Sequence, residues 1–346
     1  MARILVTGGA GYVGSVCCRE LLERGDEVVI IDDLSTGHVS AVPDGAILYQ
    51  MDFGDRAQLA TLLGRTEIDA VFHFAAKALI PESVSNPGVF FDTNVASGIA
   101  MLEVLREFPV KRFVFSSSAA VYGSPQSAPI TEDQQKAPIN SYGETKLMFE
   151  RVLHWYATAY RWAVVAFRYF NASGATEHAG EDHRPETHII PLLLQTASGE
   201  RPYFEIYGDD YATPDGTCVR DYVHVSDIAR AHIAALQLPD NSGMVSYNIG
   251  TGHGYSVREV IAVVEEVTGR KIPVKHAPKR SGDPAVLCAS PDKLIRELDW
   301  RPDDSDLRNI VRSAWEWKQS QTQIRSEDPK MDGLRKLASE NIAVSS

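Results

Sequence analysis

A short strand followed by a glycine-rich turn opens the chain and constrains its fold more than any other feature. Arg3–Thr7 is an apolar run, Gly8, Gly11 and Gly14 follow at intervals of three, and residues 16–22 have the apolar spacing of a helix. Glycines allow a sharp turn and the close approach of a pyrophosphate, which backbone N–H groups and a helix dipole would bind. The stretch predicts a dinucleotide site, with a tight turn that binds no ligand as the alternative.

The second predicted strand, residues 27–31, leads into two aspartates. Asp32 and Asp33 begin 18 residues after Gly14. In the dinucleotide-binding fold a carboxylate at this place hydrogen-bonds the adenosine ribose and repels a 2′-phosphate. The sequence therefore favours NAD over NADP.

Alternating strand and helix patterns continue through the first half and predict an α/β fold, a Rossmann doubly wound parallel sheet. The further predicted strands are residues 47–51, 70–74, 112–115 and 163–167, and the predicted helices are 56–63, 86–107 and 142–160. Ligands of such sheets bind beyond the carboxyl ends of the strands. Asp52 follows one strand end, where it would reach an adenine or lie on a surface loop. Ala75 and Ala76 follow another and leave room for a cofactor.

The pattern becomes less regular from Asn171 onward and predicts a smaller C-terminal α/β domain. We expect an NAD-binding domain over residues 1–170, to which segments near 224–250 return, and a substrate-binding domain over 171–320. Residues 321–346 are polar and predict a disordered or loosely helical tail.

Composition limits the classes of function. The 346 residues carry a net charge of -12 without long acidic runs, which argues against a nucleic acid or an anionic membrane as a partner. No uninterrupted apolar run reaches the ~18 residues typical of a spanning helix, and the first strand leaves no room for a signal peptide. We expect a cytoplasmic protein. The four cysteines have neither disulfide nor zinc spacing, so no metal is expected.

Three serines and a Tyr-x-x-x-Lys pair predict acid–base chemistry. Ser116, Ser117 and Ser118 end the fifth strand, and Tyr142 follows Ser118 by 24 residues. Positions i and i+4 place Tyr142 and Lys146 on one face of a helix. A tyrosine of pKa about 10 is a poor base at neutral pH, but a nearby ammonium and a positive nicotinamide ring favour the phenolate. A chance pair on a solvated helix is the alternative.

Together these motifs resemble the extended short-chain dehydrogenase/reductase family, and within it the UDP-glucose 4-epimerases. The resemblance rests on residues 8–14, 116–123, 142–146, 168–175, 215–225, 247–252 and 280–283, and it extends from residue 2 to about residue 318. It implies interconversion of UDP-glucose and UDP-galactose, in galactose metabolism, with one tightly bound NAD. Tyr142 would take the proton of the sugar 4-hydroxyl, Ser118 would bind the 4-oxygen, and Lys146 would act on Tyr142 and the nicotinamide ribose. Ser117 is the alternative to Ser118.

The resemblance also implies two sets of binding residues and a homodimer packed through the helices at 86–107 and 142–160. For NAD they are Gly8, Gly11, Tyr12, Val13, Gly14, Asp32, Asp33, Asp52, Phe53, Phe74, Ala75, Ala76, Lys77, Asn94, Ser116, Tyr142, Lys146 and Tyr169. For the UDP-sugar they are Ser118, Tyr142, Asn171, His188, Ile206, Tyr207, Arg220, Arg280, Asp283 and Leu287. The two arginines would bind phosphate, because a guanidinium fork suits its oxygens. Pairing with a carboxylate of the same domain is the alternative for Arg220.

Three residues depart from the family pattern. His188 stands where many members have Asn. Its imidazole would either bind a phosphate or lie on the surface. Leu287 replaces either a large tyrosine or a small residue and leaves the preference for N-acetylated sugars open. Lys77 lies one place earlier than the lysine that contacts the cofactor in relatives.

Two other functions fit the same fold. The same chemistry on another UDP-sugar, an N-acetylhexosamine or a pentose, is the nearest, and a non-catalytic sugar-nucleotide-binding protein is more remote. A 4,6-dehydratase needs an acid/base pair after the strand-five serine, where this chain has Ala119 and Ala120.

Overall fold

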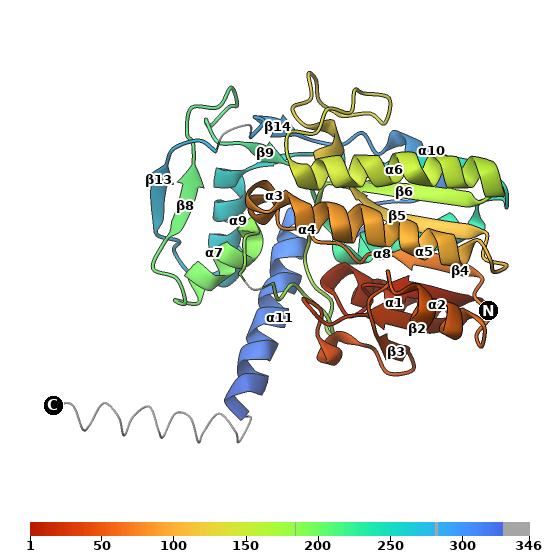
Figure 1. Ribbon diagram of the computed structural model, residues 1–346. Coiled ribbons are helices and arrows are strands. Elements are labelled where there is room, and N and C mark those ends of the chain that lie inside the picture. Colours follow the sequence, from red (N-terminus) through yellow and green to blue (C-terminus); the bar gives the residue numbers. More distant parts are fainter. Residues whose placement is uncertain (184, 281–282, 328–346) are drawn as a thin grey trace.

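A seven-stranded parallel sheet forms the centre of the larger domain (Figure 1). The computed structural model describes residues 1–183, 185–280 and 283–327. Across the sheet the strand order is β11-β6-β5-β4-β1-β2-β3. The strands are β1 (Arg3–Thr7), β2 (Glu27–Asp32), β3 (Ile47–Gln50), β4 (Ala70–His73), β5 (Arg112–Ser118), β6 (Ala163–Tyr169) and β11 (Gly243–Ile249). The order reverses between β1 and β4, which is where ligands of doubly wound sheets bind.

Helices cover both faces of this sheet, so its strands are apolar on both sides. One face packs against α1 (Tyr12–Glu23), α8 (Val225–Ala234) and α10 (Asp292–Leu298), and the other against α2 (Arg56–Leu63), α5 (Gly98–Leu105) and α6 (Ser141–Tyr160). Successive residues of β1 alternate accordingly, because Ile4 and Val6 join the first core and Leu5 joins the second. These observations confirm the predicted α/β Rossmann class.

The helix expected over residues 86–107 contains an irregular turn. Its segments are α4 (Pro87–Phe91), a π-helical turn over Asp92–Ser97, and α5; a short helix, α3 (Ile80–Ser85), precedes them. Among the described residues, this is the one helix long and apolar enough to cross a membrane by length and composition alone. It packs against α2 and α6, as a core helix does.

The smaller domain has short strands and a core of its own. Its elements are β7 (Asn171–Ser173), α7 (Ile189–Ala197), β8 (Phe204–Tyr207), β9 (Val219–Arg220), β10 (Tyr222–His224), β12 (Tyr255–Ser256), α9 (Val257–Thr268), β13 (Val274–Ala277), β14 (Val286–Leu287) and α11 (Leu307–Glu327). Helices α7, α9 and α11 share one apolar cluster, and Figure 1 shows α11 extending away from the body of the molecule.

Two boundaries differ from the sequence expectation. Leu294 of α10 and Trp300 are buried in the core of the large sheet, and the Trp300 indole donates to the Asp227 carbonyl at 2.8 Å, so this segment belongs with the Rossmann domain. Helix α11 continues to Glu327, so the first seven residues of the expected 321–346 tail are helical. Residues 328–346 lie outside the described part of the chain.

Candidate active site

The end of β5 and the start of α6 bring Ser118 and Tyr142 together. The Asn140 side chain caps α6 by accepting a hydrogen bond from the Gly143 amide at 2.8 Å. A Cβ at Gly143 would lie 2.5 Å from the Ala120 carbonyl oxygen, so only glycine lets the helix approach the turn after Ser118 this closely. The Ser118 hydroxyl is close enough to Tyr142 to act against the burial that raises the tyrosine pKa. This contact is the geometry that proton transfer at a substrate oxygen requires.

Lys146 lies one turn along the same helix and is almost fully buried. Its Nζ donates to the Ser116 carbonyl at 2.7 Å and lies 5.8 Å from the centre of the Tyr142 ring. Burial lowers the pKa of Lys146 to about 7, although Glu150 acts in the opposite direction. Burial also raises the pKa of Tyr142, against the effect of its contact with Ser118. In the protein without NAD, burial is therefore the largest effect on the tyrosine pKa.

Ser117 points to the other face of β5 and joins a buried polar network. Its hydroxyl donates to Glu150 Oε1 at 2.6 Å, and Arg168 donates to both Glu150 oxygens at 3.0 and 2.7 Å. Arg168 also donates to the Tyr122 hydroxyl, which donates to Asn248 Oδ1. Ser117 is thus occupied by a structural contact, which favours Ser118 as the substrate-facing serine.

The glycine-rich turn forms a cradle beside the topological switch point. A Cβ at Gly8, whose φ is +75°, would lie 2.5 Å from the Ala75 amide nitrogen, and one at Gly14 would lie 2.1 Å from the Gly8 carbonyl oxygen. Gly11 is different, because a Cβ there would approach the Gly8 carbonyl alone, at 3.3 Å. Packing thus requires glycine at 8 and 14, whereas at 11 glycine leaves open space.

This cradle fits a dinucleotide. Gly11 is the N-cap of α1 and supplies no side-chain hydrogen bond, so the amides of the first turn face the open space, as an anion site requires. Asp32 is buried beside it and accepts from the Ala10 and Leu34 amides, each at 2.9 Å. Burial raises the pKa of Asp32. A carboxylate held in this way is suited to a ribose hydroxyl.

Other predicted cofactor residues act mainly through local structure. Asp33 and Asp52 are exposed and accept from the Ser35 and Gly54 amides at 2.9 and 2.7 Å. Val13 is half-buried against the core below α1, and Ala75 donates its amide to the Thr7 carbonyl at 3.1 Å beside half-buried Ala76.

The predicted aromatic cofactor residues contact other parts of the protein. The Phe53 ring packs on His73 and the Phe74 ring on His232, at 5.1 and 4.8 Å between ring centres. The Tyr169 hydroxyl bonds His232 Nε2 at 2.7 Å, and the Tyr12 hydroxyl donates to the Gly174 carbonyl at 2.6 Å, which joins the glycine turn to the second domain.

Asn94, in the π-helical turn, holds the loop after β4 to α6. Its Oδ1 accepts from the Lys77 amide at 2.8 Å, and its Nδ2 donates to the Lys77 carbonyl and to Thr145 Oγ1, each at 3.0 Å. In the described part of the chain the Asn94 side chain thus bonds the loop at Lys77 and the helix that carries the catalytic pair, and does not bond Ser116, Ser117 or Ser118. Lys77 contributes its backbone to this contact.

The predicted substrate residues gather on the facing edge of the smaller domain. Arg220 and Leu287 are paired in register on β9 and β14, and Arg220 forms an ion pair with Asp283. The Arg280 guanidinium lies 4.0 Å from the centre of the Tyr207 ring. Leu287 also packs on the cluster formed by Ala119, Val121, Tyr122, Ile130 and Leu147, which flanks Ser118 and Lys146. The second domain therefore meets the first at the catalytic end of β5.

Three further predicted substrate residues have partners within the protein. Asn171 donates from Nδ2 to the Asp221 carbonyl at 2.7 Å, and Ile206 is buried in β8. His188 Nδ1 lies 2.5 Å from Glu181 and 2.9 Å from Glu186. Burial alone would lower the pKa of His188, but these carboxylates raise it to about 10. Two acidic partners thus surround the imidazole for which a phosphate contact is predicted.

Sequence reasoning missed the roles of Glu150, Arg168 and Gly143. Glu150 follows Lys146 by four residues on α6, so the helical period was a signal for its position. The partner Arg168 lies on another strand, and only the fold brings the two together.

Comparison with known proteins agrees with this geometry. A model of the NAD dependent epimerase/dehydratase family matches residues 4–250. The UDP-glucose 4-epimerase of Lacticaseibacillus casei is 46% identical over 320 residues, which is 92% of this chain and 97% of that protein, and that of Streptococcus mutans is 47% identical over 322 residues, 92% and 97%.

Solved structures give the same result. The Brucella ovis UDP-glucose 4-epimerase in complex with NAD superposes with a TM-score of 0.88 at 43% identity, covering 91% of this chain and 98% of that one. The Bifidobacterium longum enzyme in complex with NAD+ and UDP gives 0.87 at 37% identity, covering 92% and 98%. The chain belongs to the NAD-dependent epimerase/dehydratase family and, within it, to the UDP-glucose 4-epimerases.

Proposed function

We propose that this NAD-dependent isomerase interconverts UDP-glucose and UDP-galactose by inverting the configuration at sugar C4. The observation that carries the proposal is the contact between Ser118 and Tyr142, with Lys146 one turn away on the same helix face. NAD bound at the glycine-rich turn and Asp32 would supply the acceptor and donor of the C4 hydride. Tyr142 takes the proton of the 4-hydroxyl and later gives it back, while Ser118 holds the 4-oxygen in place. The net redox change is zero.

The nucleotide end of the substrate would be held by the second domain. Arg220 and Arg280 offer planar guanidinium forks to the two phosphates, and Asn171 offers an amide. Since Arg220 is paired with Asp283, a phosphate would share this guanidinium with the carboxylate or replace it. Asp283 then becomes available to a ribose hydroxyl, and the backbone of Ile206 and Tyr207 to the uracil. Such an anchor leaves the sugar free to turn between the two hydride transfers.

The test uses the protein as purified. The bound nucleotide is released by denaturation and identified, and UDP-galactose conversion is measured without added NAD. We expect NAD and conversion in the wild type, and loss of conversion with NAD retained in Tyr142→Phe. Tyr160→Phe, at the exposed end of the same helix, should remain active. An enzyme that carries NAD and leaves UDP-galactose unchanged would overturn the proposal. Conversion of UDP-N-acetylhexosamines, measured in the same assay, decides the sugar preference that Leu287 leaves open.

We also propose a homodimer that forms through the helices α4, α5 and α6. On these helices Val89 is 36% exposed and Trp155 is 68% exposed, which is unusual for large apolar side chains on a water-facing surface. Light scattering should give the mass of two chains, and Trp155→Glu should give one chain with NAD still bound. A monomeric wild type would contradict this assembly.

A cytoplasmic location is proposed as well. The four cysteines are free thiols, and three of them are buried, as suits a reducing compartment. Fractionation of the producing cells would test it, and recovery outside the cytoplasm would refute it.

A further inference from the structure

The loop before α7 carries four metal-ligating side chains in one cluster. The residues are Glu181, His183, Glu186 and His188, in the pattern Glu-x-His-x-x-Glu-x-His, and their donor atoms all lie within 4.8 Å of one another. Both imidazoles turn Nδ1 inward, His183 at 3.1 Å and His188 at 2.5 Å from the same Glu181 oxygen. The cluster lies outside the catalytic residues, and cysteine spacing gave no sign of it.

Its donor set suits a transition metal. Metal binding displaces the extra proton of an imidazole, so with an ion bound the two carboxylates and two imidazoles supply two negative charges and four ligand atoms, which match a divalent ion. Ligand bonds of 2.0–2.2 Å in a tetrahedron place donor atoms roughly 3.3 Å apart, so the observed spacing needs only small side-chain rotations. Imidazole nitrogen favours zinc over magnesium or calcium.

The surroundings hold the carboxylates in place. The Glu181 and Glu186 side chains are each 7% exposed, so two anions are taken out of water side by side. Such a pair needs compensating positive charge. Glu186 also accepts from the amides of Thr187 and His188, each at 2.7 Å, which fixes its orientation.

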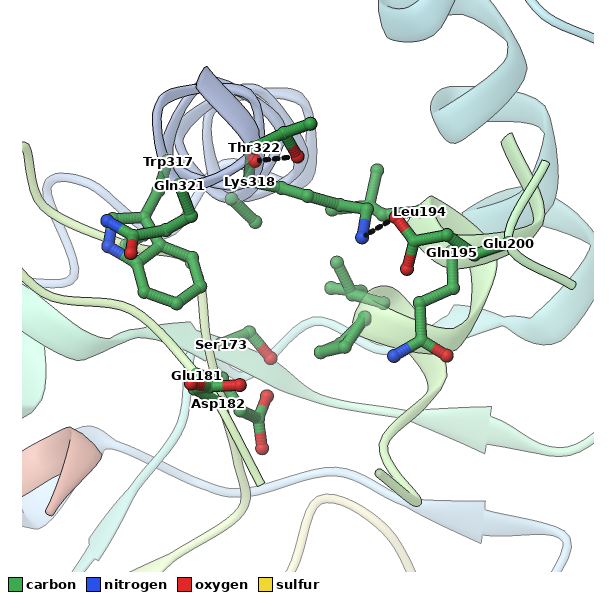
Figure 2. A pocket seen from close by; sticks show the side chains of 15 residues that line it. Ser173, Glu181, Asp182, Leu194, Gln195, Glu200, Trp317, Lys318, Gln321 and Thr322 are labelled. Carbon is green, nitrogen blue, oxygen red and sulfur yellow. Dashed lines mark hydrogen bonds and ion pairs between the residues drawn. The ribbon is translucent and has the colours of Figure 1, made fainter. Parts of the chain in front are cut away.

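The loop joins the two domains and borders a cavity. His38 of the Rossmann domain lies 3.2 Å from the Asp182 carbonyl, and Tyr12 is bonded to Gly174 at the start of the loop. Glu181 lines a cavity of about 340 Å³ formed with α7 and α11, where Figure 2 shows it beside Asp182 and across from Lys318 and Gln321. The cavity opens onto Glu181, one of the four residues of the cluster.

We propose that Glu181, His183, Glu186 and His188 bind one divalent transition-metal ion, with Zn²⁺ as the best match, in a structural site that fastens this loop between the domains. Four protein ligands close the coordination shell, as in structural zinc sites. In this arrangement His188 is a metal ligand.

The experiment titrates Co²⁺ into untagged, full-length, NAD-bound enzyme that has been treated with EDTA and desalted. We expect the visible bands of tetrahedral Co²⁺ to saturate at one equivalent and to be lost on adding Zn²⁺. Mutation of a residue that only hydrogen-bonds a metal ligand lowers metal affinity about 10–100-fold. Loss of a ligand itself, in His183→Ala or His188→Ala, should therefore weaken Co²⁺ binding at least that much. His178→Ala is the matched control, since this imidazole is 52% exposed on the same loop and 4.0 Å from Glu177.

Thermal unfolding gives a second measurement that does not depend on activity. Zn²⁺ should raise the unfolding temperature of the wild type and of His178→Ala, but not of the ligand variants. NAD content and circular dichroism check that the variants fold, and His183→Gln replaces the alanine variant if that one does not. Absence of the bands at one equivalent, or their persistence in the His183→Ala/His188→Ala double variant, would overturn the proposal.

Discussion

Replacing either of two neighbouring serines by alanine should have opposite effects on stability and on activity. Ser117 and Ser118 are adjacent on β5, and their side chains point to opposite faces of the strand. Ser117 is buried and donates to Glu150, whereas Ser118 is half-buried and contacts Tyr142. We expect Ser117→Ala to lower the free energy of unfolding and to keep the activity. Ser118→Ala should keep most of the stability and lose most of the activity.

The magnitudes follow from these contacts. A hydrogen bond to a charged group contributes about 1.5–3 kcal/mol, and in Ser117→Ala the buried Glu150 keeps only the donors of Arg168. Ser118→Ala removes the contact with Tyr142 and a hydrogen bond from the Ala120 amide at 3.2 Å, the latter about 1 kcal/mol for a capping serine. Loss of a donor at the reacting oxygen lowers kcat by about 10²–10³.

The assay pairs urea unfolding with UDP-galactose conversion for the two variants and the wild type. Each variant controls for the other, because the same hydroxyl is removed one residue apart. A larger loss of kcat in Ser117→Ala than in Ser118→Ala would refute the assignment of Ser118 to the reacting oxygen. Equal losses of stability in both would also contradict the assignment of Ser117 to the buried network.

The remaining predictions concern the network, the buried lysine and the glycine turn. Glu150→Gln and Arg168→Met should each cost about 3–5 kcal/mol in urea unfolding, and the double variant less than their sum, because it leaves no unpaired buried charge; additive costs would refute the pairing. In nucleotide-free protein, folded Lys146 loses its proton above about pH 7 and the unfolded chain only near pH 10.5, so the unfolded state binds more protons in that window. Wild-type stability should therefore rise by about 1.4 kcal/mol per pH unit relative to Lys146→Met between pH 7 and 10, and a flat difference would contradict the lowered pKa. Gly11→Val should fold but contain little NAD after purification, whereas Gly88→Ala, where a Cβ meets no atom within 4 Å, should retain it; full NAD content in Gly11→Val would argue against the cradle.

The larger domain could be predicted from the sequence because its signals are local. Apolar strand runs and helical periods gave six strands and their crossover helices, and a segment near 224–250 was expected to return to the sheet, as β11 does. The π-helical turn at Asp92–Ser97 was not predictable, because its residues fit an ordinary helix and Asn94 acts through partners on distant segments. Likewise, only packing shows that Leu294 and Trp300 belong with the large sheet.

The site was predictable as a set of residues but not as a set of contacts. Motif spacing gave Tyr142, Lys146 and the three serines, yet alternation along a strand does not say which face meets the substrate. The burial of Glu150 with Arg168 answers that question for Ser117. The pairing of Arg220 with Asp283 joins residues 63 apart, and neither side chain alone indicates the other.

The pKa shifts of Tyr142 and Lys146 bear on the form in which the catalytic base is present. Burial favours the uncharged forms of both Tyr142 and Lys146, so the protein does not hold a ready phenolate beside an ammonium. A neutral tyrosine with a neutral lysine has the same number of protons as a phenolate with an ammonium. Because the pKa of Lys146 is about 7 and burial raises that of Tyr142, Lys146 loses its proton first in the nucleotide-free protein, and the proton that remains is on the tyrosine. An apparent pKa near 7 in a pH profile of the nucleotide-free protein would therefore belong to Lys146 rather than to the tyrosine.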